Sequence, residues 1–292
     1  MGGVDCCGSG DDGRRKMAKL TYKFTRDTLF KAFFVKYPEL LKSLVTQALG
    51  IDINALTEFR VTNPNIPSEV MGEKFCELDV KMTVNGQTVN LEIQVDDEGD
   101  YPERSLYYWA KCYSRKLAEG EEYIDLPRTI AINIVAFNLF KDTKDVHSEF
   151  RALEVTRHTE LTDKMSLHYF ELKKLPEVTE SDAGNVLKLW LALFQAETDE
   201  EMEKLVKIGG ELMEQAVQGY KSVVVSKEFI ELESMRDRAR NNEKAALSRA
   251  RREGKLEGKL EGVEEVFTLL EQGYSVDEAK AILAKKRTTE RP

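Results

Sequence analysis

The stretch ELDVKMTVNGQTVNLEIQV, residues 77–95, decides the fold of this chain. It consists of two runs of alternating polar and apolar residues on either side of Asn85-Gly86. This dipeptide favours a two-residue type I′ turn, because both central positions of that turn need φ > 0. The stretch is therefore predicted to be a β-hairpin.

A two-residue loop also sets the register of the hairpin. Val84 then faces Gln87, and Asp79 faces Glu92. Because side chains alternate between the two faces of a strand, the hairpin has one apolar and one polar face. The apolar face holds Leu78, Val80, Met82, Val84, Val89, Leu91, Ile93 and Val95. The polar face holds Glu77, Asp79, Lys81, Asn90, Glu92 and Gln94.

The predicted register places two carboxylates opposite each other. The Cβ atoms of Asp79 and Glu92 would be about 5 Å apart, where like charges are destabilising. A bound hard cation such as Mg²⁺ removes that repulsion, since it prefers carboxylate oxygens. The alternative is a solvated sheet face whose acids turn into water or pair with Lys81. The hairpin by itself leaves both interpretations open.

Length and composition favour a folded protein without a membrane span. The chain has 292 residues, of which 41% are hydrophobic, enough for one large domain or two smaller ones. No apolar run reaches the ~18 residues of a membrane span. Residues 1–19 lack the apolar stretch of a secretory signal. They are predicted to be a disordered extension, with Met17 as a possible true start, and the protein is predicted to be cytoplasmic and to have no membrane partner.

The cysteine and histidine positions and the net charge argue against several kinds of active site and binding surface. The four cysteines form no CxxC pair and the three histidines are scattered, which argues against a zinc site or a histidine triad. Hydrolysis would then have to use carboxylates and a metal. The net charge of −9 argues against a generally basic surface, but residues 236–259 hold nine Lys or Arg and four Asp or Glu. Any nucleic-acid surface is therefore expected to be local.

The order of elements predicts an α/β core with a mixed sheet. A helix begins near Asp27, breaks at Pro38 and resumes until Gly50. An edge strand is expected over 55–62, then the hairpin, a helix over 102–118, and strands over 128–137 and 166–172. Helices interleaved with hairpin and single strands indicate a mixed sheet flanked by helices.

The rest of the chain is predicted to be helical. Residues 186–196 are apolar on a broad face and should dock on the core, and 199–218 and 226–249 form polar amphipathic helices. The repeat RREGKLEGKLEG follows, with glycines at 254, 258 and 262. Each interior glycine costs about 1 kcal/mol of helix stability relative to Ala. The repeat is thus a site of close helix approach, a hinge, or a solvated linker. Residues 263–292 read as two short helices, the second capped by Ser275 with Glu278.

Asp79 followed by Glu92-Ile93-Gln94 resembles the PD-(D/E)XK nuclease signature, with Gln at the usual lysine position. The segments around it are DTLFKAFF, NLEIQV, ERSLYYWAKCY, GEEY and HYFELKK. As an ordered set over roughly residues 22–200, they are similar to the Rpn family of recombination-promoting nucleases, also labelled putative transposases. The resemblance implies a restriction-endonuclease-like core over 20–198. A helical region over 199–262 and a C-terminal helical hairpin over 263–292 complete the predicted domains.

The resemblance also implies a function. It is that of a Mg²⁺-dependent DNA endonuclease, with Mn²⁺ as a possible substitute, linked to recombination or mobile elements. Asp79 and Glu92 would ligate the metal with the Ile93 carbonyl. Gln94 carries no positive charge but would orient the attacking water through its amide. Lys81 is a candidate for the missing charge.

Further residues are candidates of lower weight. Asp27 would add an acidic group borne on a helix, and Arg104, Tyr108 and Arg115 would contact phosphates, although packing explains the aromatic residues equally well. The expected partners are DNA and a second copy of the chain, bound through the C-terminal helices. The alternative function is an inactive relative that binds DNA or a regulatory partner.

Overall fold

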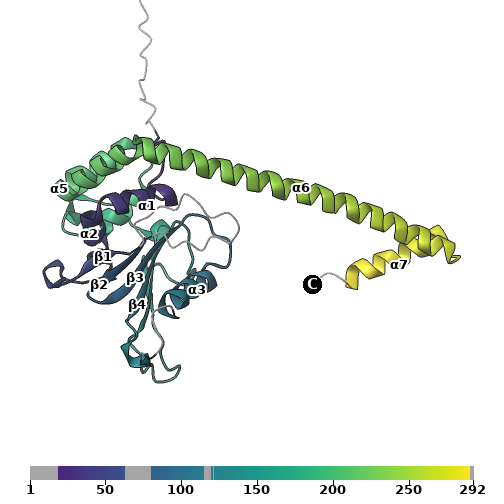
Figure 1. Cartoon of the computed structure of the whole chain (residues 1–292), viewed down its shortest axis with the longest axis horizontal. Coiled ribbons are helices and arrows are strands. Elements are labelled where there is room, and N and C mark those ends of the chain that lie inside the picture. Colours follow the sequence, from purple (N-terminus) through teal and green to yellow (C-terminus); the bar gives the residue numbers. More distant parts are fainter. Residues whose placement is uncertain (1–18, 63–79, 115–119, 121, 290–292) are drawn as a thin grey trace, which may run out of the picture. The chain divides into compact units, whose positions relative to one another are not determined.

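The computed structural model describes residues 19–62, 80–114, 120 and 122–289 (Figure 1). The chain divides into two compact units, Met1–Leu232 and Glu233–Pro292. The predicted Met17 start, the extension before residue 19, Asp79 and Arg115 all lie outside the described residues.

The first unit is built on a six-stranded mixed sheet, which confirms the predicted fold class. Its order is β1-β2-β3-β4-β6-β5. β1 to β3 pair antiparallel, β3, β4 and β6 run parallel, and β5 is antiparallel to β6. The strands are β1 (Phe59–Val61), β2 (Val80–Val84), β3 (Gln87–Gln94), β4 (Thr129–Val135), β5 (His147–Phe150) and β6 (Met165–Glu171).

The predicted hairpin forms β2 and β3 in the predicted register. Val84 pairs with Gln87 and Val80 with Leu91. Both turn residues have positive φ, 48° at Asn85 and 74° at Gly86, as a type I′ turn requires. The Asn85 side chain also accepts a hydrogen bond from the Thr57 amide, which ties the turn to the chain before β1.

Four helices cover one face of the sheet. They are α1 (Asp27–Lys36), α2 (Pro38–Leu49), α4 (Val186–Gln195) and α5 (Asp199–Val224). The break at Pro38 and the left-handed cap at Gly50 are as predicted. The aromatic side chains of this layer pack against the apolar side chains of β2, β3 and β4 in one core. Trp190 and Phe30 are fully buried there. This layer is the main source of stability of the first unit.

One helix covers part of the other face. α3 (Tyr101–Ser114) links β3 to the parallel strand β4. Parallel neighbours need such a crossover connection. It packs Tyr101 into a smaller core with residues of β4 and β6, and its Trp109 indole donates a hydrogen bond to the Thr129 carbonyl oxygen at 2.7 Å. The polar face of β3 is beside this helix.

Three features differ from the sequence reading. β5 falls within a stretch interpreted as a loop, because only four residues pair at the sheet edge and three of them are exposed. α5 packs on α1 and α4 and buries Met213, so the compact unit extends beyond the predicted boundary at 198. A single helix, α6 (Lys227–Glu271), takes the place of the predicted helix over 226–249, the Glu-Gly repeat and the first of the two short helices expected after residue 263.

The second unit contains most of α6 and α7 (Val276–Thr289). Ser275 and Glu278 form the predicted reciprocal cap, since each side chain bonds the other residue's backbone amide. Across the described residues, no helix is long and apolar enough to cross a membrane.

Candidate active site

The candidate site lies on β3, where the two faces of one strand differ in character. Val89, Leu91 and Ile93 enter the large apolar core. Asn90, Glu92 and Gln94 alternate with them and face the side of α3. Asn90 and Glu92 are only 1% and 9% exposed. The strand therefore buries a carboxylate and an amide side by side on the sheet face toward α3.

Asn90 and Glu92 are joined by a hydrogen bond. The Asn90 Nδ2 donates to Glu92 Oε1 at 2.9 Å. This orientation of the amide is required because a carboxylate only accepts. It leaves Asn90 Oδ1 buried, and that oxygen has no hydrogen-bond partner among the residues that the structure describes. Leaving a buried acceptor unpaired costs about 1–3 kcal/mol.

Lys81, Gln94 and Ile93 surround this pair. Lys81 is the cross-strand partner of Asn90, so it lies diagonal to Glu92 on the same face. The Gln94 Nε2 donates to the Asp96 carbonyl oxygen at 2.9 Å, which holds the end of its side chain beside the loop after β3. Ile93 turns its side chain into the apolar core. The structure thus brings Glu92, Ile93 and Gln94 together at the end of β3, with Lys81 beside them on β2, although the Ile93 side chain turns to the other face.

A network of buried polar groups continues the face across the sheet. Asn133, which pairs with Glu92 across β3 and β4, accepts a hydrogen bond from the Tyr101 hydroxyl at 3.0 Å. Its own amide donates to the His168 carbonyl oxygen at 3.1 Å. On α3, Ser105 is within 2.5 Å of the Tyr169 hydroxyl. These bonds fix α3 beside Glu92. Sequence reasoning missed Asn90 and Asn133, although the place of Asn90 two residues before Glu92 was a usable signal.

The structure also places the other candidates. Arg104 pairs with Glu98 at 2.8 Å and stacks over the Tyr101 ring at 5.1 Å, and its Nε is buried without a partner. Tyr108 is half-buried on α3. Asp27 opens α1, in the layer on the opposite face of the sheet from Glu92, and accepts from the Thr28 amide. Their roles stay predictions, as does that of Arg115.

A second polar cluster lies at the far edge of the sheet. His147 and His168 stack and share a 3.0 Å hydrogen bond between Nε2 and Nδ1. Ser166 is 2.8 Å from the other His168 nitrogen and donates to Glu149. Burial lowers the pKa of His168 to about 4, although Glu149 opposes the shift. The cluster is thus built to hold neutral imidazoles.

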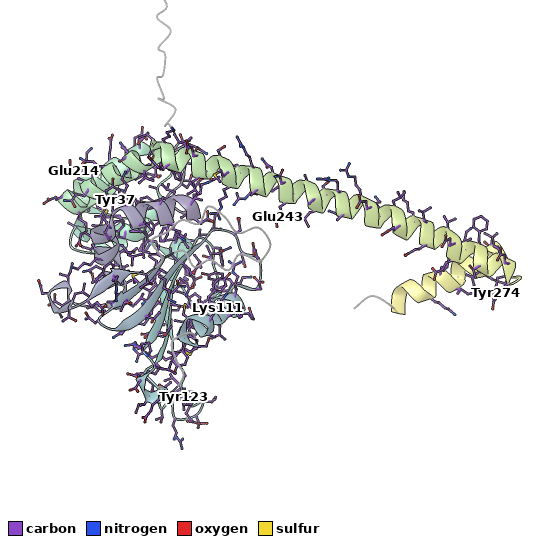
Figure 2. All side chains as sticks on the ribbon, in the orientation of Figure 1. Tyr37, Lys111, Tyr123, Glu214, Glu243 and Tyr274 are labelled. Carbon is purple, nitrogen blue, oxygen red and sulfur yellow. The ribbon has the colours of Figure 1, made fainter. Side chains whose placement is uncertain are left out.

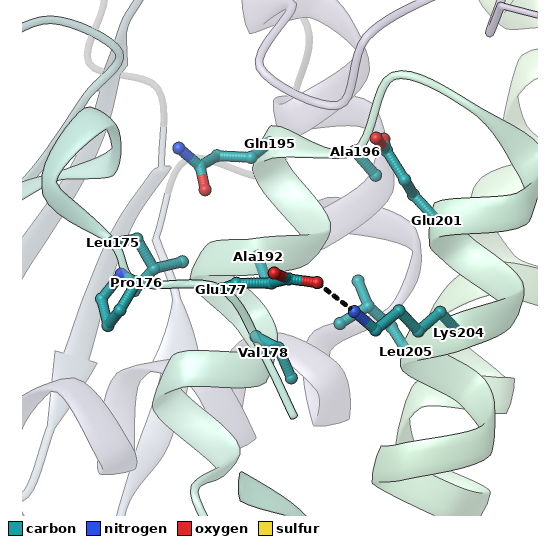
Figure 3. Close-up of a pocket in the computed structure, with 10 residues that line it drawn as sticks. All are labelled: Leu175, Pro176, Glu177, Val178, Ala192, Gln195, Ala196, Glu201, Lys204 and Leu205. Carbon is teal, nitrogen blue, oxygen red and sulfur yellow. Dashed lines mark hydrogen bonds and ion pairs between the residues drawn. The ribbon is translucent and has the colours of Figure 1, made fainter. Parts of the chain in front are cut away.

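A pocket of the first unit lies away from the polar face of β3. It has a volume of about 310 Å³ and lies between α4, α5 and the segment after β6 (Figure 3). Its polar side chains already have structural partners. Glu177 pairs with Lys204, and Glu201 closes the capping box of α5. None of its lining residues belongs to the polar face of β3, so this pocket carries no chemistry linked to Glu92.

A family model described as PD-(D/E)XK nuclease family transposase matches residues 25–250. The chain belongs to this family. The match spans the whole sheet, both helical layers and the start of α6. No curated protein and no solved structure matches the chain.

The residues of the polar face fit a divalent cation. Within the described ranges, no group of three or more His, Cys, Asp or Glu is arranged to hold a metal, but Asp79 lies outside them. The donors that are described are oxygens, the Glu92 carboxylate and the orphaned Asn90 Oδ1. Hard cations such as Mg²⁺ choose oxygen ligands. A cation or its hydration shell would satisfy the unpaired acceptor.

Proposed function

We propose that this member of the PD-(D/E)XK nuclease family transposases is a Mg²⁺-dependent DNA endonuclease. The observation that carries the proposal is the buried Glu92 carboxylate beside an unpaired Asn90 oxygen. Asp79, which directly precedes β2 in the sequence, would supply the second carboxylate. The fold alone would not suffice, because one fold hosts many functions.

Each residue has a distinct part in the proposed reaction. Asp79, Glu92 and the Ile93 carbonyl hold the cation, and Asn90 fixes the Glu92 carboxylate through its amide. When bound, the cation neutralises charge on the phosphate and makes water a stronger nucleophile. Gln94 directs the attacking water with its amide, after release from the Asp96 carbonyl. Lys81 adds positive charge at the scissile phosphate. Asp27 lies in the helical layer on the opposite face of the sheet, so we assign it no part in this reaction.

DNA would approach over the loop after β3 and over α3. Arg104 would exchange its exposed partner Glu98 for a phosphate, and Tyr108 and Arg115 would add further phosphate contacts. The basic residues of 236–259 offer a second phosphate contact. We also propose that the C-terminal helices join two copies of the chain. A role in recombination or mobile-element movement, and a cytoplasmic location, complete the proposal.

The test is nicking of supercoiled plasmid by the purified protein, with Mg²⁺, with Mn²⁺ and with EDTA. Cleavage is expected with either metal and not in EDTA. Asp79→Ala and Glu92→Ala should each abolish it, while Glu98→Ala, a matched removal of a nearby exposed carboxylate, should not. Full activity in EDTA, or in either variant, would contradict the proposal. DNA binding without cleavage under any of these conditions would favour the inactive relative.

A further inference from the structure

The second unit leaves a regular apolar stripe uncovered. Leu256, Leu260, Val263 and Phe267 on α6 are 62%, 58%, 51% and 61% exposed. Their spacing of four, three and four residues continues to Leu270 and is that of positions a and d of a heptad. Such a stripe on a helix marks a surface for a partner.

α7 does not account for this stripe. The residues of α6 that are partly buried near its end are Gly262, Val266, Leu269 and Leu270, and α7 buries Ala279 to 1%. At 3.6 residues per turn, the exposed stripe is centred about 100° around the helix from these residues. The chain turns at Gly273 into α7 (Figure 1), which is only 14 residues long.

The length of α6 favours packing against a partner. It has 45 residues, and side chains project around it near Glu243 (Figure 2). Most helical stability in proteins comes from packing of an apolar face rather than from propensity. The three glycines of the repeat lower propensity further. Burying the stripe would offset both costs.

The charges that flank the stripe select the partner and its direction. With Leu260 and Phe267 at a, Arg252 and Lys259 occupy g, while Glu257 and Glu264 occupy e. In a parallel pair, each g residue meets the e residue five positions later in the other helix. Arg252 then meets Glu257 of the second copy. In an antiparallel pair, g residues face g residues and e residues face e residues. The basic residues would then lie opposite basic ones, and the acidic residues opposite acidic ones.

We propose that α6 forms a parallel, in-register two-stranded coiled coil with a second copy of this chain, through residues 256–270. This gives the self-association proposed above a specific surface, and it does not depend on nuclease activity. The glycines take no part in the seam. Gly254 and Gly258 lie at outer heptad positions, and an added Cβ at either meets nothing within 4 Å. The predicted close approach through glycines is replaced by packing of Leu, Val and Phe.

Light scattering on the full-length protein tests the seam. The wild type is expected to have the mass of a dimer, and Leu260→Asp combined with Phe267→Asp that of a monomer. Glu261→Asp combined with Glu265→Asp, on an outer face of the same turns, should stay dimeric. Circular dichroism of the wild type and of both double variants would show that the first unit remains folded. One mass for the wild type and the seam variant would overturn the proposal.

Charge exchange tests the direction. Lys259→Glu should weaken dimerisation about tenfold, because it faces Glu264 of the second copy. Adding Glu264→Lys should restore it, and Lys255→Glu, the same charge change outside the seam, should have less than a twofold effect. Mixing the Lys259→Glu and Glu264→Lys single variants should yield a heterodimer tighter than either homodimer. Equal stability of all three dimers would rule out the parallel register.

Discussion

The two faces of β3 are both buried, but one is apolar and packs in the core, whereas the other is polar. Val89, Leu91 and Ile93 enter a core shared with four helices, and any residue of similar volume and polarity would maintain it. Asn90 and Glu92, between them in sequence, are equally inaccessible but polar, and Asn90 leaves an acceptor unpaired. The unpaired oxygen costs stability, and an apolar residue at position 90 would avoid that cost. The difference indicates that the apolar face supports the structure and the polar face is kept for a ligand.

The sharpest contrast between the faces comes from adjacent residues. Glu92→Ala should reduce plasmid nicking below detection, because it removes a proposed cation ligand, while the free energy of unfolding falls by no more than about 1–3 kcal/mol, which is what an unpaired Asn90 amide costs. Leu91→Ala should show the reverse pattern, with a loss of about 2–5 kcal/mol of stability from the cavity that it leaves. Urea unfolding and single-turnover cleavage on both variants measure the two effects. A large stability loss in Glu92→Ala would break the comparison.

The apolar face of the sheet also holds one buried titratable residue of β6, His168. His168 shares the face of β6 with Phe170, and burial lowers its pKa from 6.5 to about 4. As the pH falls, His168 is protonated at a higher pH in the unfolded chain than in the folded one. The free energy of unfolding should therefore decrease between pH 6.5 and pH 4, and His168 should cause no further decrease below pH 4. The shift corresponds to about 3 kcal/mol at most.

The control for this pH effect is His168→Gln. Its stability should vary less with pH than that of the wild type over the same interval, in urea titrations at pH 7 and pH 5. The surrounding His147, Glu149, Arg128 and Arg151 are unchanged in both proteins. Parallel pH profiles would mean that His168 is not held neutral by burial.

Gln94 is expected to give the smallest of these effects. Gln94→Ala should slow cleavage about tenfold to a hundredfold while Mg²⁺ affinity stays within a few-fold, since the amide is assigned to water and not to the metal. Gln94→Glu would be the matched variant that keeps size and adds an acceptor. Calorimetry showing lost Mg²⁺ affinity in Gln94→Ala, with unchanged turnover at saturating metal, would reverse this assignment.

The sequence was informative where local chemistry determines structure. Asn85-Gly86 and the period of two predicted the hairpin register, and Pro38 and Gly50 predicted the limits of α2. It was less informative where distant contacts decide. β5 forms only because β6 lies beside it, and α5 joins the first unit because Met213 and Tyr220 find a core made by α1 and α4. Alternation placed Asn90 beside Glu92, but its unpaired oxygen is visible only in three dimensions.

Thermal unfolding of the wild type and Glu92→Gln, each with and without Mg²⁺, tests whether the polar face of β3 binds a cation through Glu92. The substitution keeps the shape and an acceptor for the Asn90 amide but removes the charge. Without metal, the variant should be at least as stable as the wild type, because the substitution removes the charge of a buried carboxylate. Mg²⁺ should raise the Tm of the wild type and leave that of Glu92→Gln unchanged. Equal responses of the two proteins to Mg²⁺ would contradict a cation site on the polar face of β3.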